Sequence, residues 1–145
     1  REHGFEDITK FLVEYVSNHP EVDRHIDEEQ RMFGKSNDNF VLDAHLGFHF
    51  VPDSIRLCLV CELEEASNRI LKDGHRKNEV SKSINESIVA SQKRKDTMRK
   101  NYLNLYKVDI DDPKNFDLVL DTTKLTSLEV FKNISLFIDD KNSIN

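Results

Sequence analysis

The spacing of apolar positions predicts two helices at the start of the chain. Apolar side chains recur at helical spacing through Phe5–Ser17, and Pro20 ends this helix because proline cannot continue one. Pro20 then fits the first turn of a second helix. We expect that helix to run to about Phe33 and to end at Gly34.

Three further helical segments are expected downstream. Leu63–Leu71 has helical spacing, and Arg76–Tyr106 is a long polar region with an apolar stripe only in its first half. "TSLE" at Thr126–Glu129 has the spacing of a capping box, a pair of side chains that bond the free N–H groups at a helix start. The helix after it carries apolar residues one or two turns apart. Its polar tail is expected to fray.

Short apolar segments between these helices predict strands at Phe40–Leu42, Ile55–Val60 and Leu118–Leu120. The residues between the first two segments fit a loop or a short helix. Because strands alternate with helices, we expect an α/β fold with a parallel sheet and helices on both faces.

Ligands of open parallel sheets bind at the carboxyl ends of the strands. This rule places Asp43–His45, Cys61–Glu62 and Asp121–Thr123 on the functional rim, independently of any family.

Composition narrows the class of protein. A length of 145 residues suits one domain, and a net charge of -6 gives no global basic field to recruit nucleic acid. No apolar run approaches the roughly 20 residues that span a membrane, and we expect no secretory signal. Cys58 and Cys61 lie in an apolar strand without a second pair, which favours reduced thiols in the cytoplasm. The first residue is Arg1, so we expect a piece of a longer protein.

Four segments resemble the archaeal-type cytidylate kinases, which are P-loop nucleoside monophosphate kinases. The longest is Arg94–Leu125, "RKDTMRKNYLNLYKVDIDDPKNFDLVLDTTKL", which resembles R-E-x-S-E-x-x-R-Y-x-x-x-Y-G-I-D-I-x-D…Y-D-L-V-I-D-T-S. Glu21–Gln30 resembles the helix I-D-x-x-I-D-x-x-Q, and Asn39–Phe48 resembles the strand V-x-E-G-R-L-A-G. Glu65–Leu71 resembles the helix R-A-x-R-I that leads into the lid. Together the segments cover most of the chain.

The resemblance implies ATP-dependent phosphoryl transfer to CMP or dCMP, with ATP and Mg as cofactors of the intact protein. It implies monophosphate-binding helices over 1–36, core segments over 37–75 and 107–145, and a helical lid over 76–106. It assigns Arg94 and Arg99 to catalysis. The implied substrate-binding residues are Asp23, Asp27, Asp43, His45 and Arg69. The residues implied near the nucleotide base are Asp121, Thr122 and Thr123.

The chain departs from the family in two ways. No G-x-x-x-x-G-K-[ST] phosphate cradle occurs in these residues, so the chain alone is expected to hold no ATP. Several family arginines are replaced, which lowers the expected rate because phosphoryl transfer depends on placed cations. The replacements stand at His45, Ala66, Asp73 and Asn101.

The missing amino-terminal segment would also carry the central strand of the family's sheet. We therefore expect an incomplete fold in which the edges of the first two predicted strands either face an empty slot or pair directly. The alternative to a kinase is a catalytically degenerate module that binds nucleotide or a regulatory partner. A purely structural domain is the third possibility, and the oligomeric state is open.

Simpler readings of the same residues stay open. The basic cluster Lys93–Lys100 suits a solvated helix as well as a lid that closes on phosphate. Asp23 and Asp27 share a helix face, as an acid–base pair or as a solvated acidic surface. His45 and His49 have a spacing that could bind metal in a helix, which Gly47 between them disfavours.

Overall fold

The computed structural model describes residues 20–73 and 83–144. In chain order the elements are α2 (Pro20–Ser36), α3 (Gly47–Phe50), β1 (Leu57–Val60), α4 (Leu63–Lys72), α5 (Ile84–Tyr106), the 3-10 turn η3 (Pro113–Asn115), β2 (Leu118–Asp121) and α6 (Ser127–Ile144). The helix predicted over Phe5–Ser17 and the part of the predicted lid before position 83 lie outside the described residues.

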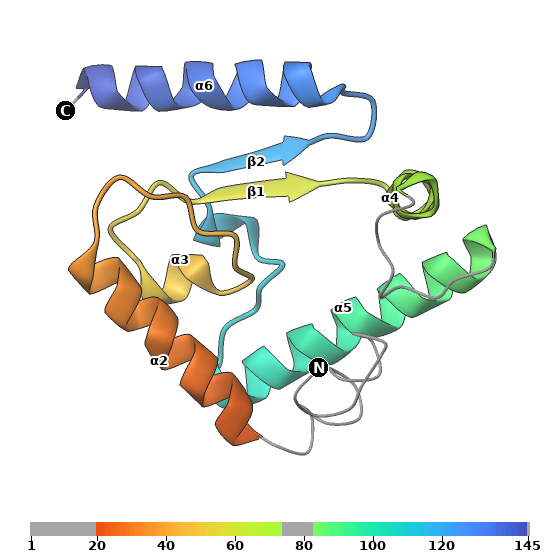
Figure 1. Ribbon diagram of the computed structural model, residues 1–145, viewed down its shortest axis with the longest axis horizontal. Helices are drawn as coiled ribbons and strands as arrows, with labels where there is room; N and C mark the ends of the chain where they lie inside the picture. The colour runs from red at the N-terminus through yellow and green to blue at the C-terminus, as the bar shows by residue number, and fades with distance from the viewer. Residues whose placement is uncertain (1–19, 74–82, 145) are drawn as a thin grey trace.

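The strands β1 and β2 form a two-stranded parallel sheet in the described part of the chain. Leu57 pairs with Leu118 and Val60 pairs with Asp121, so both strands end at the same edge. Figure 1 shows α6 running along one side of this pair, with α2, α3 and α5 on the other side. The predicted α/β class with parallel strands is confirmed for these two segments.

The strand predicted at Phe40–Leu42 is wrong, because these residues have no regular secondary structure. Val41 is 99% exposed, and the ring of Phe40 packs edge-on against Phe33 of α2. An extended segment needs a neighbour to bond its backbone N–H and C=O groups. The described residues place no strand beside this segment, so it remains irregular.

Gly34 does not end α2, contrary to the prediction, because the helix continues to Ser36. The glycine is instead required by packing, since an ideal Cβ at this position would lie 2.7 Å from Cγ2 of Val51. After the helix, the side-chain amide of Asn37 donates to the carbonyl of Phe33. The absence of a side chain at position 34 therefore lets α2 pass close to the segment that follows α3.

The predicted capping box at the start of α6 is confirmed. The hydroxyl of Thr126 donates to Oε2 of Glu129, and the N–H of Glu129 donates back to that hydroxyl. The expected fraying of the tail is wrong, since α6 continues to Ile144. Near its end, Nζ of Lys141 lies 2.7 Å from Oδ1 of Asp117, which holds the helix to the start of β2.

Asp117 also bonds the residue that precedes β1. Its carboxylate accepts from the backbone N–H of Arg56 at 2.8 Å and from Nε of the same residue at 3.0 Å. The guanidinium of Arg56, and then the ammonium of Lys141, hold the pKa of Asp117 well below its usual range. This carboxylate therefore joins the amino ends of both strands to α6.

The core of the described residues is small. Its buried apolar side chains are Leu46, Phe50 and Met98, which come from α3, the residue before it and α5. On the strands, Leu59 is 52% exposed and Val119 is 42% exposed. Cys58 and Cys61 are free, half-buried thiols. None of the described helices combines the length and the apolar character of a membrane-spanning helix.

Substituting Gly34→Ala should destabilise the protein although alanine is the better helix former. The intrinsic gain of about 1 kcal/mol is outweighed by overpacking of about 1–3 kcal/mol against Val51, whose branched side chain is stiff. We expect a net loss of roughly 1 kcal/mol in the free energy of unfolding, measured by denaturant titration.

The matched control is the double variant Gly34→Ala, Val51→Ala. Removing the methyl groups that the new Cβ meets should make Gly34→Ala neutral or stabilising in this background. A loss of the same size in both backgrounds would contradict the close approach of α2 to Val51.

Candidate functional site

The carboxyl ends of β1 and β2 are joined by a tight polar loop at Asp121–Thr123. The N–H of Thr122 donates to the carbonyl of Val60 at 2.8 Å, and its hydroxyl donates to the same oxygen at 3.0 Å. The hydroxyl of Thr123 accepts from the N–H of Glu62 at 2.9 Å. Two of the predicted rim segments, Cys61–Glu62 and Asp121–Thr123, are therefore brought together.

The side chain of Asp121 makes hydrogen bonds within the same loop. Its Oδ1 accepts from the N–H of Thr123 at 2.9 Å and from the hydroxyl of Thr123 at 2.6 Å. The hydroxyl bond, and then the backbone bond, lower the pKa of Asp121. The carboxylate is thus engaged with its own loop.

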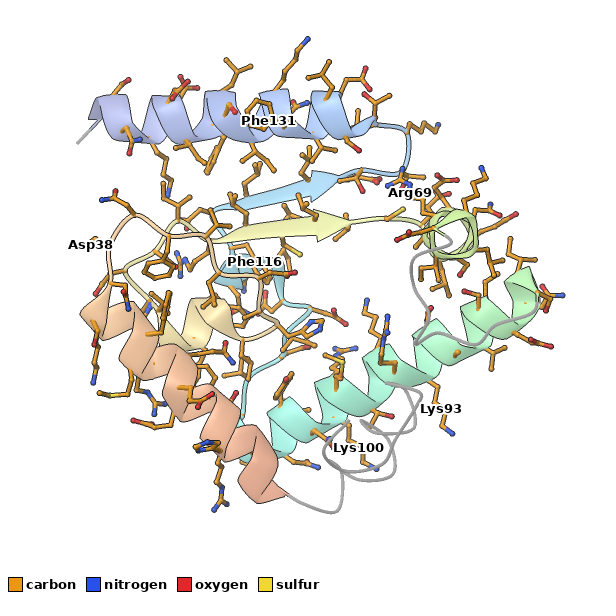
Figure 2. The ribbon with its side chains drawn as sticks, viewed as in Figure 1. Asp38, Arg69, Lys93, Lys100, Phe116 and Phe131 are labelled. Carbon is orange, nitrogen blue, oxygen red and sulfur yellow. The ribbon has the colours of Figure 1, made fainter. Side chains whose placement is uncertain are left out.

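Arg69 reaches this loop from α4 (Figure 2). Its Nη2 lies 2.9 Å from the carbonyl oxygen of Thr122 and 3.1 Å from that of Thr123. Its Nε donates to Oε1 of Glu65, one turn earlier on the same helix, at 2.9 Å. The guanidinium is directed at backbone oxygens.

A second group of charges joins α5 to the segment before η3. Arg99 makes a two-pronged contact with Asp109, with Nε–Oδ1 at 2.8 Å and Nη2–Oδ2 at 2.6 Å. Lys95, one turn earlier, lies 3.3 Å from Oδ1 of Asp111. The guanidinium of Arg99 lowers the pKa of Asp109, and the carboxylate of Asp109 raises the pKa of Arg99. Arg99 and Lys95 of α5 are therefore paired with carboxylates of the segment that follows the helix.

His45 and Cys58 lie near the same face of α5. The pKa of His45 is lowered, first by partial desolvation and then by the positive charge of Arg94, with Asp43 acting in the opposite direction. Burial and the carboxylate of Asp111 raise the pKa of Cys58. Charged and titratable side chains of α5 and of the segments beside it form what we call the α5 charge cluster. Its members are Asp43, His45, Arg94, Lys95, Arg99, Asp109 and Asp111.

Asp27 lies apart from the α5 charge cluster, in the contact between α2 and the end of α5. It is 5% exposed and accepts a hydrogen bond from the hydroxyl of Tyr106. The ring of Tyr106 also packs against His49 and Phe50 of α3, with centroids 5.6 Å and 5.4 Å away. Burial raises the pKa of Asp27, which the Tyr106 hydrogen bond opposes.

The structure thus divides the predicted residues among three places. Arg94, Arg99, Asp43 and His45 belong to the α5 charge cluster, and Arg69 joins the loop at Asp121–Thr123. Asp27 lies in the α2–α5 contact, and the side chain of Asp23 lies outside the described residues. Sequence reasoning placed Lys95 in the basic cluster of the lid but gave no roles to Asp109, Asp111 and Tyr106. The signal was the "DIDD" run ten residues after Arg99, where acidic side chains reach back to α5.

An open hollow of about 470 Å³ lies between the start of α4 and the first half of α5. Its lining includes Leu63, Ile88, Val89 and Lys93, and none of the predicted site residues. Among the residues that the structure describes, no group of three or more His, Cys, Asp or Glu side chains is placed to hold a metal ion.

Comparison with known proteins relates the chain to kinases of nucleotides. It is 32% identical to a cytidylate kinase of Sulfolobus acidocaldarius, over 94% of this chain and 72% of that kinase. It is also 32% identical to a cytidylate kinase of Thermococcus kodakarensis, over 86% of this chain and 62% of that kinase. No protein-family model and no solved structure matches the chain.

The similarity to the Sulfolobus protein covers most of both sequences and shows that the chain belongs to the family of these cytidylate kinases. A longer relative is a protein of Lacinutrix mariniflava named an S-adenosylmethionine-dependent nucleotide dehydratase. The chain is 37% identical to it over 87% of its own length, which is 25% of that protein. The chain thus spans a quarter of one relative and about three fifths of the Thermococcus kinase.

Substituting Tyr106→Phe should destabilise the protein at neutral pH, because it leaves the buried Asp27 carboxylate without its donor. The loss in the free energy of unfolding should be about 1–3 kcal/mol at pH 7. The pKa of Asp27 is already raised in the folded protein, so its ionisation lowers stability as the pH rises through that pKa. Removing the phenol raises that pKa further, and the loss should therefore shrink below the ordinary pKa of 3.8.

Denaturant titrations at pH 3.5 and pH 7 measure this difference. The control is Tyr106→Phe in an Asp27→Asn background, where no carboxylate remains and the cost should vary little with pH. A cost independent of pH in the unmodified background would contradict the Asp27–Tyr106 bond.

Proposed function

We propose that the chain is the acceptor and lid portion of a kinase that transfers the γ-phosphoryl group of ATP to CMP or dCMP. The observation that carries this proposal is the family membership, since the similarity to the Sulfolobus kinase extends over 94% of the chain. The α5 charge cluster supports it, because this cluster gathers Arg94, Lys95 and Arg99 within two turns of one helix. Cations aimed at the transferred phosphoryl group are the main catalytic contribution in such kinases.

Arg94 and Arg99 are the cations we assign to the transferred phosphate. Arg99 is held by Asp109 at 2.6 Å and 2.8 Å, so it must exchange a carboxylate for a phosphate as the lid closes. Asp43 and His45 lie beside Arg94 and suit contacts to the acceptor nucleotide. Asp23 and Asp27 are assigned to the acceptor side, Arg69 to substrate binding, and the loop at Asp121–Thr123 to the base vicinity, all from the resemblance.

The donor site is proposed to lie on a segment of the intact protein beyond these residues. The P-loop motif does not occur in this sequence, and the chain spans 62–72% of the two kinases. That segment would supply the backbone N–H groups, the lysine and the hydroxyl that hold ATP and Mg. It would also supply the central strand beside β1, whose second edge has no partner strand among the described residues.

The same strand would give Phe40–Leu42 a neighbour. In the family's sheet the central strand lies between the counterparts of this segment and β1. Pairing there would satisfy the backbone groups of the irregular segment around Val41, which is now 99% exposed. The proposal therefore accounts for both the irregular segment at Phe40–Leu42 and the unpaired edge of β1.

A second candidate is a module that binds nucleotide without catalysing transfer. Two observations favour it: the replaced arginines at His45, Ala66, Asp73 and Asn101, and the match to a quarter of a nucleotide dehydratase. In such a protein the module would hold a nucleotide for chemistry carried out elsewhere. Incubating the intact protein with ATP, Mg and CMP separates the candidates, since the kinase forms CDP and ADP in equal amounts and the binding module forms neither.

Substituting Arg94→Ala in the intact protein should lower kcat for CMP phosphorylation by about 100-fold, the usual cost of losing a group that stabilises transition-state charge. The free energy of unfolding should change little, because Arg94 is a half-buried helix residue outside the buried core. The control is Lys132→Ala on the exposed part of α6, which should leave both quantities unchanged. Unchanged turnover in Arg94→Ala would remove the lid role.

A further inference from the structure

The contact between Arg69 and the loop at Asp121–Thr123 uses the guanidinium as a clamp on the backbone. Nη2 is shared by two consecutive carbonyl oxygens, those of Thr122 at 2.9 Å and Thr123 at 3.1 Å. Nη1 lies 3.4 Å from the hydroxyl oxygen of Thr122. Two successive carbonyl oxygens can approach one donor only where the backbone turns sharply, and their partial negative charges then repel each other. A cation between them offsets that repulsion.

The loop's own polar groups are satisfied within the protein. The N–H and the hydroxyl of Thr122 donate to Val60, and those of Thr123 donate to Asp121. The N–H of Leu125 donates to the carbonyl of Thr122 at 3.1 Å. Thr122 is 6% exposed, so its side chain is enclosed by the fold. The loop is thus a fixed turn whose shape depends on these bonds.

A second contact, with Glu65 on the same helix, orients the guanidinium of Arg69. Nε donates to Glu65 at 2.9 Å, so the planar fork is oriented before it meets the loop. About 42% of the Arg69 side chain is exposed, which leaves room for substitution without disturbing the core. A lysine has no planar fork and cannot bond the Thr122 hydroxyl and both carbonyls from the same position.

We propose that Arg69 is a positioning residue that fixes the loop at Asp121–Thr123 in the shape that receives a nucleotide base. This assignment rests on the proposed function for the identity of the ligand, and on the bonds above for the clamp. Nε of Arg69 is engaged with Glu65 and Nη2 with the carbonyl oxygens of Thr122 and Thr123. Arg69 therefore acts through the loop, in place of the direct substrate contact that the resemblance implies. Arg69 therefore affects the affinity for one nucleotide, whereas Arg94 and Arg99 are the residues assigned to the transferred phosphate.

Hydrogen–deuterium exchange tests the clamp without any kinase assay. In Arg69→Gln, the amides of Thr122, Thr123 and Leu125 should exchange at least 10-fold faster, because the loop loses the cation that holds its curl. Arg69→Lys should show most of the same acceleration. The control is Arg24→Gln, an exposed arginine of α2, which should leave these amides unchanged. Unchanged exchange at the three amides in both Arg69 variants would overturn the clamp.

Kinetics of the intact protein test the consequence for the nucleotide. A positioning role predicts that Arg69→Gln raises KM about 10-fold for one of the two nucleotides, with kcat within 3-fold of the parent, and that Arg69→Lys does not rescue it. A fall in kcat of about 100-fold, partly rescued by Arg69→Lys, would show a phosphate contact and overturn the positioning role. If Arg69→Gln speeds the exchange but the parent protein forms no CDP, the clamp is upheld and the kinase function is rejected.

Discussion

The parallel pairing of β1 with β2 is the constraint on which the rest of the described structure depends. The two strands are far apart in the chain, and polar side chains join them at both ends. Asp117 bonds Arg56 at the amino ends, and Thr122 and Thr123 bond Val60 and Glu62 at the carboxyl ends. Because both ends are joined, register is fixed and the rim segments must lie together.

Two helices are attached to the sheet through these ends. Lys141 of α6 joins Asp117 at one end, and Arg69 of α4 joins the Thr122–Thr123 loop at the other. Apart from these contacts, Tyr106 at the end of α5 donates a hydrogen bond to Asp27 of α2. This arrangement leaves the sheet two strands wide in the described residues, with Leu59 and Val119 partly exposed. A sheet of this width needs further packing for independent stability, which agrees with a chain that spans part of its relatives' length.

The sequence predicted the elements whose signals are local. Helical spacing located α4 and α6, and the Thr126–Glu129 spacing located a real capping box. The errors came from tertiary context. Phe40–Leu42 has a strand's composition but finds no neighbour to pair with in the described part of the chain. Gly34 is a packing position next to Val51 inside a continuing helix. Site residues followed the same rule: the rim was predicted from strand ends, whereas the pairing of Arg99 with Asp109 depends on where the chain returns after α5.

The central claim is that these residues hold the acceptor side of a cytidylate kinase. Titration of the protein with CMP, followed by backbone amide NMR shifts, tests this claim most directly. The account predicts saturable shifts concentrated at His45, Arg94 and Arg99, with smaller shifts along α6. Binding that leaves these three positions unchanged, or no saturable binding at all, would contradict it.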